Sequence, residues 1–191
     1  MENGGENMRP TDDLREEHRA VELMLEILDS VCTNIESGKS VEQEHLEKLV
    51  EFMRIFVDKC HHTKEEAHLF PEMVKREIPG TGELIDSLLK EHNQAREYVG
   101  RIEKTVSGKE WDKKGSGIVE NSRAYIQLLA QHIEKENNGL FPKADAYLDS
   151  GVQKELLDSF ERVEDEEIGA GKHEKFHLLL HELKDIYLKS A

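Results

Sequence analysis

The 191-residue chain has few cysteines, few prolines and no long apolar run. Its two cysteines, Cys32 and Cys60, lack the close spacing of a zinc or redox motif, so we expect free thiols in a reducing compartment. No run of about 18 uncharged apolar residues occurs, and the first dozen residues contain no apolar segment, so neither a membrane span nor an export signal is expected. These absences predict a cytoplasmic protein.

Positive charge is scarce as well. The chain has 26 Lys and Arg against 41 Asp and Glu, which gives a net charge of -15 at pH 7. A surface of this sign repels phosphate backbones and anionic lipid headgroups, so neither nucleic acid nor a membrane is expected as a partner. The length suits one domain with a sizeable core. The ten histidines are the unusual feature of the composition.

Apolar residues recur every three to four positions and no stretch alternates as a strand would, so the pattern predicts an all-α protein. Ser40 as N-cap and Gln43 as its capping-box partner predict the start of the second helix. The expected helices cover residues 12–35, 40–76, 83–106 and 117–137, then 152–160, and a last helix from the glycines at 169–171 to about residue 188. The expected organisation is a disordered N-terminus (1–11), a four-helix bundle (12–148) and a C-terminal helical extension packed on it (149–191).

Two pairs of segments resemble each other within the chain. EEHRAVELMLEIL at 16–28 resembles KEHNQAREYVGRI at 90–102, and HHTKEEAHLFP at 61–71 resembles HIEKENNGLFP at 132–142. The half-chain therefore looks duplicated. Aligning the two LFP sequences matches His132 and Glu136 to His61 and Glu65, rather than to His62 and Glu66.

Each long helix directs one histidine toward the core. In the third helix His92 lies on the apolar stripe that contains Ile85, Leu88, Ala95 and Val99, and the other three histidines lie on equivalent stripes. Counting back from each turn places all four at one level, because antiparallel helices rise equally per residue. Two glutamates lie one turn beyond their histidines on the same face. The predicted cluster is His18, His61, Glu65, His92, His132 and Glu136.

Six ionisable groups at one level of an apolar bundle would each cost several kcal/mol if left without partners. A single such histidine is usually a hydrogen-bonded core residue, but four with two matched glutamates favour a metal site. The absence of thiolate suits iron, with manganese or zinc as less favoured choices. The duplicated half-site suggests two metal ions, each with two histidines, bridged by both glutamates and an oxo or hydroxo group. An open position would then remain for a diatomic molecule or peroxide.

The same residues carry a family resemblance. The order His18, His61-x-x-x-Glu65, His92, His132-x-x-x-Glu136, with LFP after each His/Glu pair, resembles the hemerythrin-like HHE cation-binding family over about residues 11–145. The resemblance implies an up-down-up-down antiparallel four-helix bundle, here with additional C-terminal helices, around a non-haem di-iron centre. It implies functions such as carrying or sensing O2, sensing NO or iron, breaking down peroxide, or repairing iron centres.

The chain departs from the oxygen-carrying members of that family at two positions. Arg96 stands where they have a second histidine one turn after that of the third helix, and Asn137 where they have an aspartate. Without the extra histidine, we expect a nearly symmetric and more open pair of ions. Reversible oxygen transport is therefore not carried over to this chain.

Several other groups have more than one interpretation. His62 and Glu66 form a second i, i+4 pair, which could be an extra ligand, a partner that orients His61, or an ion pair on the flank of the helix. His173, His177 and His181 repeat every four residues; a solvated stripe is favoured over a second metal site. Cys60 is expected to fill the core rather than to act in redox chemistry.

Two functional hypotheses of different classes follow. In the first, the protein binds O2, NO or peroxide at a His4Glu2 di-iron centre, with an electron donor as a further partner and catalase-like or peroxidase-like turnover as its enzymatic form. No catalytic residue separate from the metal ligands is evident. In the alternative, iron occupancy or bound O2 or NO is sensed, or metal is held, without turnover.

Overall fold

The computed structural model describes residues 8–108, 116–169 and 171–189. Across these ranges the chain is helical and contains no strand, as the apolar spacing predicts. Residues 1–7 of the expected disordered N-terminus and residues 109–115 of the expected turn lie outside the described ranges.

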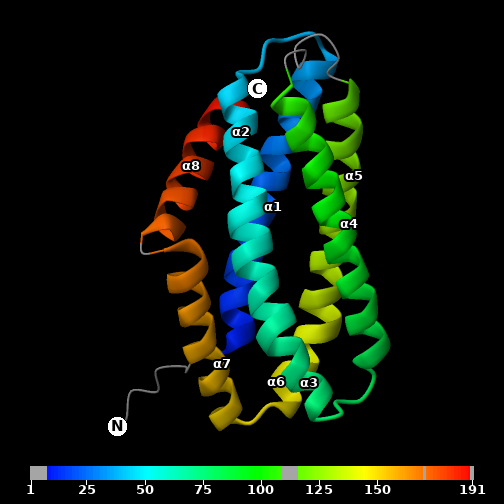
Figure 1. Cartoon of the computed structure of the whole chain (residues 1–191), viewed down its shortest axis with the longest axis vertical. Helices are drawn as coiled ribbons and strands as arrows, with labels where there is room; N and C mark the ends of the chain where they lie inside the picture. Colours follow the sequence, from blue (N-terminus) through cyan, green and yellow to red (C-terminus); the bar gives the residue numbers. More distant parts are fainter. Residues whose placement is uncertain (1–7, 109–115, 170, 190–191) are drawn as a thin grey trace.

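Long helical stretches lie side by side along the long axis of the molecule (Figure 1). The first is α1 and the third is α4, whereas the second and fourth are each built from consecutive helical segments. The elements of the bundle are α1 (Pro10–Glu36), α2 (Gln43–Phe52), η1 (Met53–His62), η2 (Lys64–Leu69), α3 (Phe70–Lys75), α4 (Gly82–Val106), α5 (Ser116–Lys135), η4 (Glu136–Leu140) and α6 (Phe141–Tyr147).

Within the bundle, three helix ends differ from the prediction by two residues or more; outside it, the helix predicted over 152–160 covers Ser150–Val163. α1 begins at Pro10, earlier than expected, because proline suits the first helical position and Asp12 accepts a hydrogen bond from the backbone of Arg9. The predicted capping box at Ser40 is wrong: α2 begins at Gln43, whose side-chain amide instead donates to the carbonyl of Val106 at the end of α4. The fourth stretch continues beyond residue 137 to Tyr147, since its later apolar residues are buried.

The second and fourth stretches contain π-helical turns at corresponding places. The N–H groups of Phe70 and Phe141 donate five residues back, to the carbonyls of Glu65 and Glu136. In both copies a proline follows immediately, and proline has no N–H for the α-helical bond and its ring crowds the preceding turn. The duplicated LFP therefore favours the two wide turns, which place Glu65 and Glu136 in π-helical backbone. The segment η1 is π-helical as well, although no proline follows it directly.

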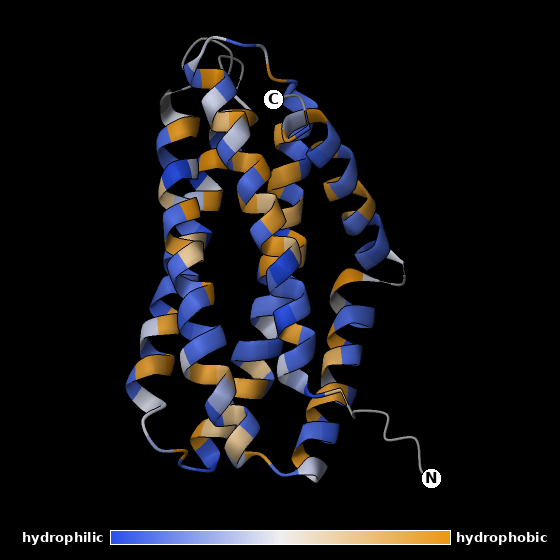
Figure 2. Cartoon of the chain, turned by 180° about the vertical axis from the view of Figure 1, so that it is seen from behind, coloured by the Kyte–Doolittle hydropathy of each residue, from blue (hydrophilic) through white to orange (hydrophobic). Residues whose placement is uncertain are grey.

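The apolar side chains form two clusters, one around Met24, Phe52 and Ile102, and the other around Leu14, Phe70 and Phe141. Apolar and polar positions recur along each helix, as Figure 2 shows. The stripe predicted for the third helix is confirmed, because the buried residues of α4 are the predicted ones: Ile85, Leu88, His92, Ala95, Val99, Ile102 and Val106.

The C-terminal part consists of α7 (Ser150–Val163), η5 (Glu164–Ile168) and α8 (Lys172–Tyr187). These elements contact α1, η1 and η2, and lie beside α1 and α2 in Figure 1. Asp149 caps α7 by accepting from the N–H groups of Gly151 and Val152. The turn before α8 uses Gly169 and Gly171 at φ values of 85° and 77°, which glycine adopts without strain. Among the described residues, no helix is both long and apolar enough to cross a membrane.

Candidate metal centre

The structure brings the six predicted side chains together between the two apolar clusters. α1 and η1 supply His18 and His61, α4 and α5 supply His92 and His132, and the π-helical segments η2 and η4 supply the glutamates. None of the six is more than 2% exposed. The level predicted by counting from the turns is therefore where these side chains meet.

Their ligand atoms form two overlapping groups. One consists of His18 and His61 with Glu65 and Glu136, and the other of His92 and His132 with the same two glutamates; within each, all ligand atoms lie within 4.8 Å of one another. Glu136 has one carboxylate oxygen 3.2 Å from His18 Nε2 and the other 3.2 Å from His132 Nε2. One oxygen of Glu65 lies 3.7 Å from His61 Nε2 and 3.5 Å from His92 Nε2. The two groups of possible metal ligands therefore share both glutamates.

Each of the four histidines has its Nδ1 atom held by an acceptor outside the cluster. When neutral, these imidazoles donate Nδ1–H outward and turn the Nε2 lone pair inward. The Nε2 atoms of His18 and His61 are 3.1 Å apart, and those of His92 and His132 are 3.0 Å apart. The Nδ1 contacts are His18 to Asn137 at 3.0 Å, His61 to Glu17 at 2.8 Å, His92 to Glu66 at 2.7 Å and His132 to Glu91 at 3.0 Å.

The inner carboxylates support a cation independently. Both oxygens of Glu65 and both of Glu136 are buried without a hydrogen-bond partner. Imidazole nitrogens lie close to them, but a neutral imidazole that donates through Nδ1 presents only a lone pair to these oxygens. Only a ring protonated on both nitrogens, as the raised pKa of His132 allows, donates to Glu136. Lone pairs facing carboxylates in a dry interior are unfavourable unless a cation lies between them. The residues present therefore fit bound metal.

The pKa values reflect this crowding. Burial lowers the pKa of His61 to about 4 and also lowers that of His92, so both favour the neutral, metal-binding form. Burial opposes charge on His132 too, but Glu136 and Glu91 outweigh it and raise the pKa of His132 to about 9. Burial and the neighbouring Glu136 raise the pKa of Glu65. Protons thus occupy part of the metal-free cluster, and an entering cation displaces them.

The two phenylalanines of the LFP repeats close one side of the cluster. Phe141 stacks on His18 with ring centroids 5.4 Å apart, and Phe70 stacks on His92 at 6.0 Å. Each repeat therefore supplies a glutamate shared by the two groups of possible ligands and an apolar ring for a histidine of another helix. These rings fix imidazole orientation and exclude water.

Cations outside the cluster balance the acceptor carboxylates. Lys64, which is fully buried, donates to Glu17 at 2.7 Å. Arg96 donates to Glu66 at 2.7 Å, and Lys135 donates to Glu91. Glu17, Glu66 and Glu91 each have a cationic partner, so these cations do not balance the negative charge of Glu65 and Glu136.

The additional histidines and glutamate of the sequence lie in three places. Glu66 accepts from His92 and Arg96 rather than pairing with His62. His62 is buried, stacks on His92 and forms a group of possible ligands with His92 and His132. His173 groups with Glu17 and Glu164, although Lys64 already lies between these carboxylates. Cys60 is buried, its thiol contacts Glu17, and burial raises the pKa of that thiol.

Sequence reasoning missed the outward partners of the histidines. Glu17 and Glu91 directly precede His18 and His92, yet each accepts from the histidine of the neighbouring stretch, His61 or His132. The available signal for these partners is the Glu-His pair that occurs in both half-chains. Periodicity alone does not show which histidine each of these glutamates contacts.

Fold and site together define an all-helical protein with a buried His/Glu cluster suited to metal ions. The sequence model of the family described as "Hemerythrin HHE cation binding domain" matches residues 9–144. The chain therefore belongs to the hemerythrin family. No curated protein and no solved structure matches it.

Proposed function

We propose that the chain is a hemerythrin-like non-haem di-iron protein that binds O2, NO or peroxide at a His4Glu2 centre. The ligands would be His18 and His61 at one ion, His92 and His132 at the other, and Glu65 and Glu136 across both. Bound iron would supply the redox change and an open coordination position. The proposal includes an oxo or hydroxo bridge, the up-down-up-down bundle of residues 12–148, an electron donor and a cytoplasmic location.

One observation carries the proposal: two four-residue groups share the same two orphaned carboxylates. A single-ion site would need only one such group and would leave the Nε2 atoms of the other two imidazoles without a cation. The set has only nitrogen and oxygen donors, which suit iron. Structural zinc sites, in contrast, are usually rich in thiolate ligands.

The protein's own side chains orient the ligand imidazoles and exclude water from the cluster; they do not transfer protons. Outward Nδ1 bonds fix which nitrogen faces each ion, and the stacked phenylalanines limit water. Such outer partners raise the basicity of the imidazole and hold its plane.

Metal analysis of the purified chain tests the proposal. After anaerobic loading with Fe2+ and removal of excess metal, we expect two irons per chain, and exposure to air should produce near-ultraviolet charge-transfer absorption. His61→Ala and His132→Ala should each reduce iron content, whereas His45→Ala should not, because His45 bonds Tyr187 away from the cluster. One zinc per chain with no iron uptake would rule out the redox function.

A second candidate function, sensing without turnover, has its own supporting observation. Glu164, at the start of η5, accepts from Lys64 at 2.6 Å; Lys64 donates to Glu17, and Glu17 holds His61. Metal occupancy at His61 could thus alter how firmly the C-terminal helices are held. Turnover predicts rapid peroxide consumption by the iron-loaded protein, whereas sensing predicts iron-dependent protection of the 164–171 region from proteases with negligible peroxide consumption.

A further inference from the structure

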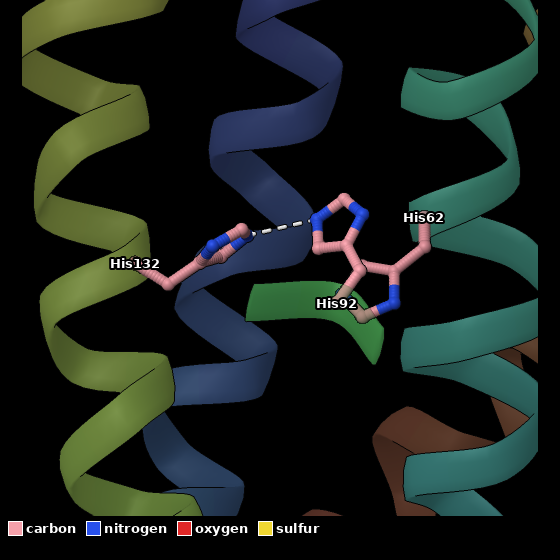
Figure 3. A group of neighbouring side chains, drawn as sticks. All are labelled: His62, His92 and His132. Carbon is pink, nitrogen blue, oxygen red and sulfur yellow. Dashed lines mark hydrogen bonds between the residues drawn. The ribbon is translucent and has the colours of Figure 1, made fainter. Parts of the chain in front are cut away.

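A third group of buried nitrogens lies beside the proposed di-iron centre. His62, His92 and His132 come from η1, α4 and α5, and each offers a ring nitrogen within 4.8 Å of the others. Figure 3 shows the three imidazoles converging from different helices. Each is 1% exposed, so water does not account for their hydrogen bonding. A cation in this group would share His92 and His132 with the ion position already assigned to these two residues.

His62 has the orphaned atom that such a role requires. Its Nε2 is buried without a hydrogen-bond partner, which is costly for an imidazole nitrogen. Its Nδ1 faces Asp58 at 3.4 Å, so the ring has an outer acceptor and an inner unpaired nitrogen. The four proposed ligand histidines likewise have an outer acceptor at Nδ1, although their Nε2 atoms contact one another in pairs.

Arg96 links the supports of His62 and His92. Its guanidinium donates to Asp58 at 2.6 Å and to Glu66 at 2.7 Å. Asp58 is the acceptor beside His62, and Glu66 is the acceptor of His92. One planar cation therefore positions the carboxylates behind two neighbouring imidazoles, which is an arrangement suited to rings that act together.

The ring of His62 is stacked on that of His92, with centroids 3.8 Å apart and planes at 19°. Because lone pairs lie in the plane of each ring and the two planes are nearly parallel, both Nε2 atoms can bind one ion only if the ring of His62 rotates about its Cβ–Cγ bond. A cavity of about 250 Å³, lined by His62, Val57, Arg96 and Tyr125 among others, adjoins the ring. The cavity provides space for that rotation.

We propose that His62 is a fifth imidazole of the centre and binds the same ion as His92 and His132. The inference rests on the proposed di-metal centre and changes it in one respect: the two ions have unequal ligand sets. Three imidazoles surround one ion, and two, from His18 and His61, contact the other. The open position for a small molecule then belongs to the ion of His18 and His61.

Cobalt titration of the full chain tests this role, because Co2+ takes imidazole and carboxylate ligands and its visible bands report coordination number. We expect two Co2+ per wild-type chain. His62→Phe keeps an aromatic ring against His92 but has no nitrogen to donate to the metal. The variant should still bind two ions, one of them with its affinity reduced about tenfold or more. Tenfold is the lower limit for losing a residue that only supports a ligand, and His62 is proposed as a ligand itself. The visible absorption of that ion should intensify as its coordination number falls. His68→Phe, on the same stretch, is the matched control and should resemble the wild type.

A second measurement needs no variant. In wild-type protein loaded with Zn2+, long-range ¹⁵N NMR distinguishes metal-bound from free imidazole nitrogens, and we expect five metal-bound Nε2 signals. Four signals, or a His62→Phe protein that titrates and absorbs as the wild type does, would show that His62 only stacks on His92. Fewer than two Co2+ in the wild type would instead contradict the di-metal centre itself, whatever the variant does.

Discussion

Lys64 is a fully buried lysine whose ammonium group is surrounded by carboxylates. It donates to Asp13 at 2.8 Å, Glu17 at 2.7 Å and Glu164 at 2.6 Å. Burial alone would lower the pKa of this amine, but Glu17 and Asp13 outweigh it and raise the pKa instead. The lysine therefore stays charged and joins α1, η2 and η5 beneath the His61 side of the cluster.

Replacing this lysine should be strongly destabilising. Lys64→Met leaves Glu17 and its neighbours as buried charges without a counter-ion, so we expect the free energy of unfolding to fall by about 3–5 kcal/mol. Urea denaturation of the metal-free chain measures the change. Lys59→Met, at an exposed position of the same stretch, should change stability little. Equal stability of both variants would mean that Lys64 has no structural role.

Glu17 provides a pH-dependent part of the stability. Burial raises its pKa, but hydrogen bonds from His61 and Lys64, with the charge of Lys64, outweigh burial and lower the pKa from 4.5 to about 2. Because the folded pKa is depressed, the contribution is fully present above pH 4.5 and is lost as the pH falls toward 2. The shift corresponds to about 3 kcal/mol at most.

Urea denaturation of chelator-treated protein at pH steps from 7 to 3 tests this. Glu17→Gln should be less stable than wild type at pH 7, and its stability should fall less steeply between pH 4.5 and 3. A decline between pH 6.5 and 4 should remain, since burial lowers the pKa of His61 to about 4. Glu16→Gln, at an exposed neighbouring position, is the control and should keep the wild-type slope. Parallel curves for Glu17→Gln and wild type would refute the assignment.

The six central residues were predictable, but their outer partners were not. Spacing along one helix determines which face His92 occupies, and counting from a turn gives its height, so the cluster follows from periodicity and duplication. The pairing of Glu17 with His61, or of Arg96 with Glu66, depends on how neighbouring helices are rotated about their axes. No spacing within a single helix carries that information.

The π-helical segments η2 and η4 connect a local backbone feature to the cluster. Glu65 and Glu136 lie within them, and a proline follows each by six residues. The sequence pattern predicts an uninterrupted helix across η2 and a helix end at residue 137, within η4, because a π-helical turn changes the apolar period too little to be recognised. The duplicated proline was the available signal.

Removing one proline should alter the site without unfolding the helix. In Pro142→Ala the backbone regains an N–H, and regular α-helical bonding can extend across η4. We expect Glu136 to move away from His18 and metal affinity to fall, while the far-ultraviolet circular dichroism spectrum stays unchanged. Co2+ titration and circular dichroism measure the two effects. Pro79→Ala, in the turn before α4, is the control; equal affinity in both variants would mean that the π-helical turn does not position Glu136.

Over the whole molecule, bound metal should stabilise the fold, since the proposed ligands come from all four long stretches. Binding to the folded state alone contributes about 2.7 kcal/mol for one site at ~100 times its Kd. For a chain of this length we expect Tm to rise by roughly 5–10 °C on addition of Fe2+ under anaerobic conditions. Differential scanning fluorimetry measures the shift. A His61→Ala, His132→Ala double variant should lose it, and a shift that persists there would indicate metal bound elsewhere.

The overall architecture was largely predictable because long amphipathic periods and a repeated motif restrict helical packing to few arrangements. The placement of the C-terminal helices on α1 and η1, rather than on α4 and α5, was not. That choice depends on complementary surfaces such as the contact between Glu164 and Lys64, which lie 100 residues apart in sequence.

The wide turns of η2 and η4 also determine how the chain tolerates changes in length. An α-helix that loses one residue rotates everything beyond the loss by about 100° relative to everything before it. A wide turn already contains one residue more than an α-helical turn, so deleting Gly139 would let η4 close into an ordinary α-helical turn, with the segments before and after it kept in register. Deleting Gly100 from the uninterrupted helix α4 would instead rotate Ile102 and Val106 away from the core.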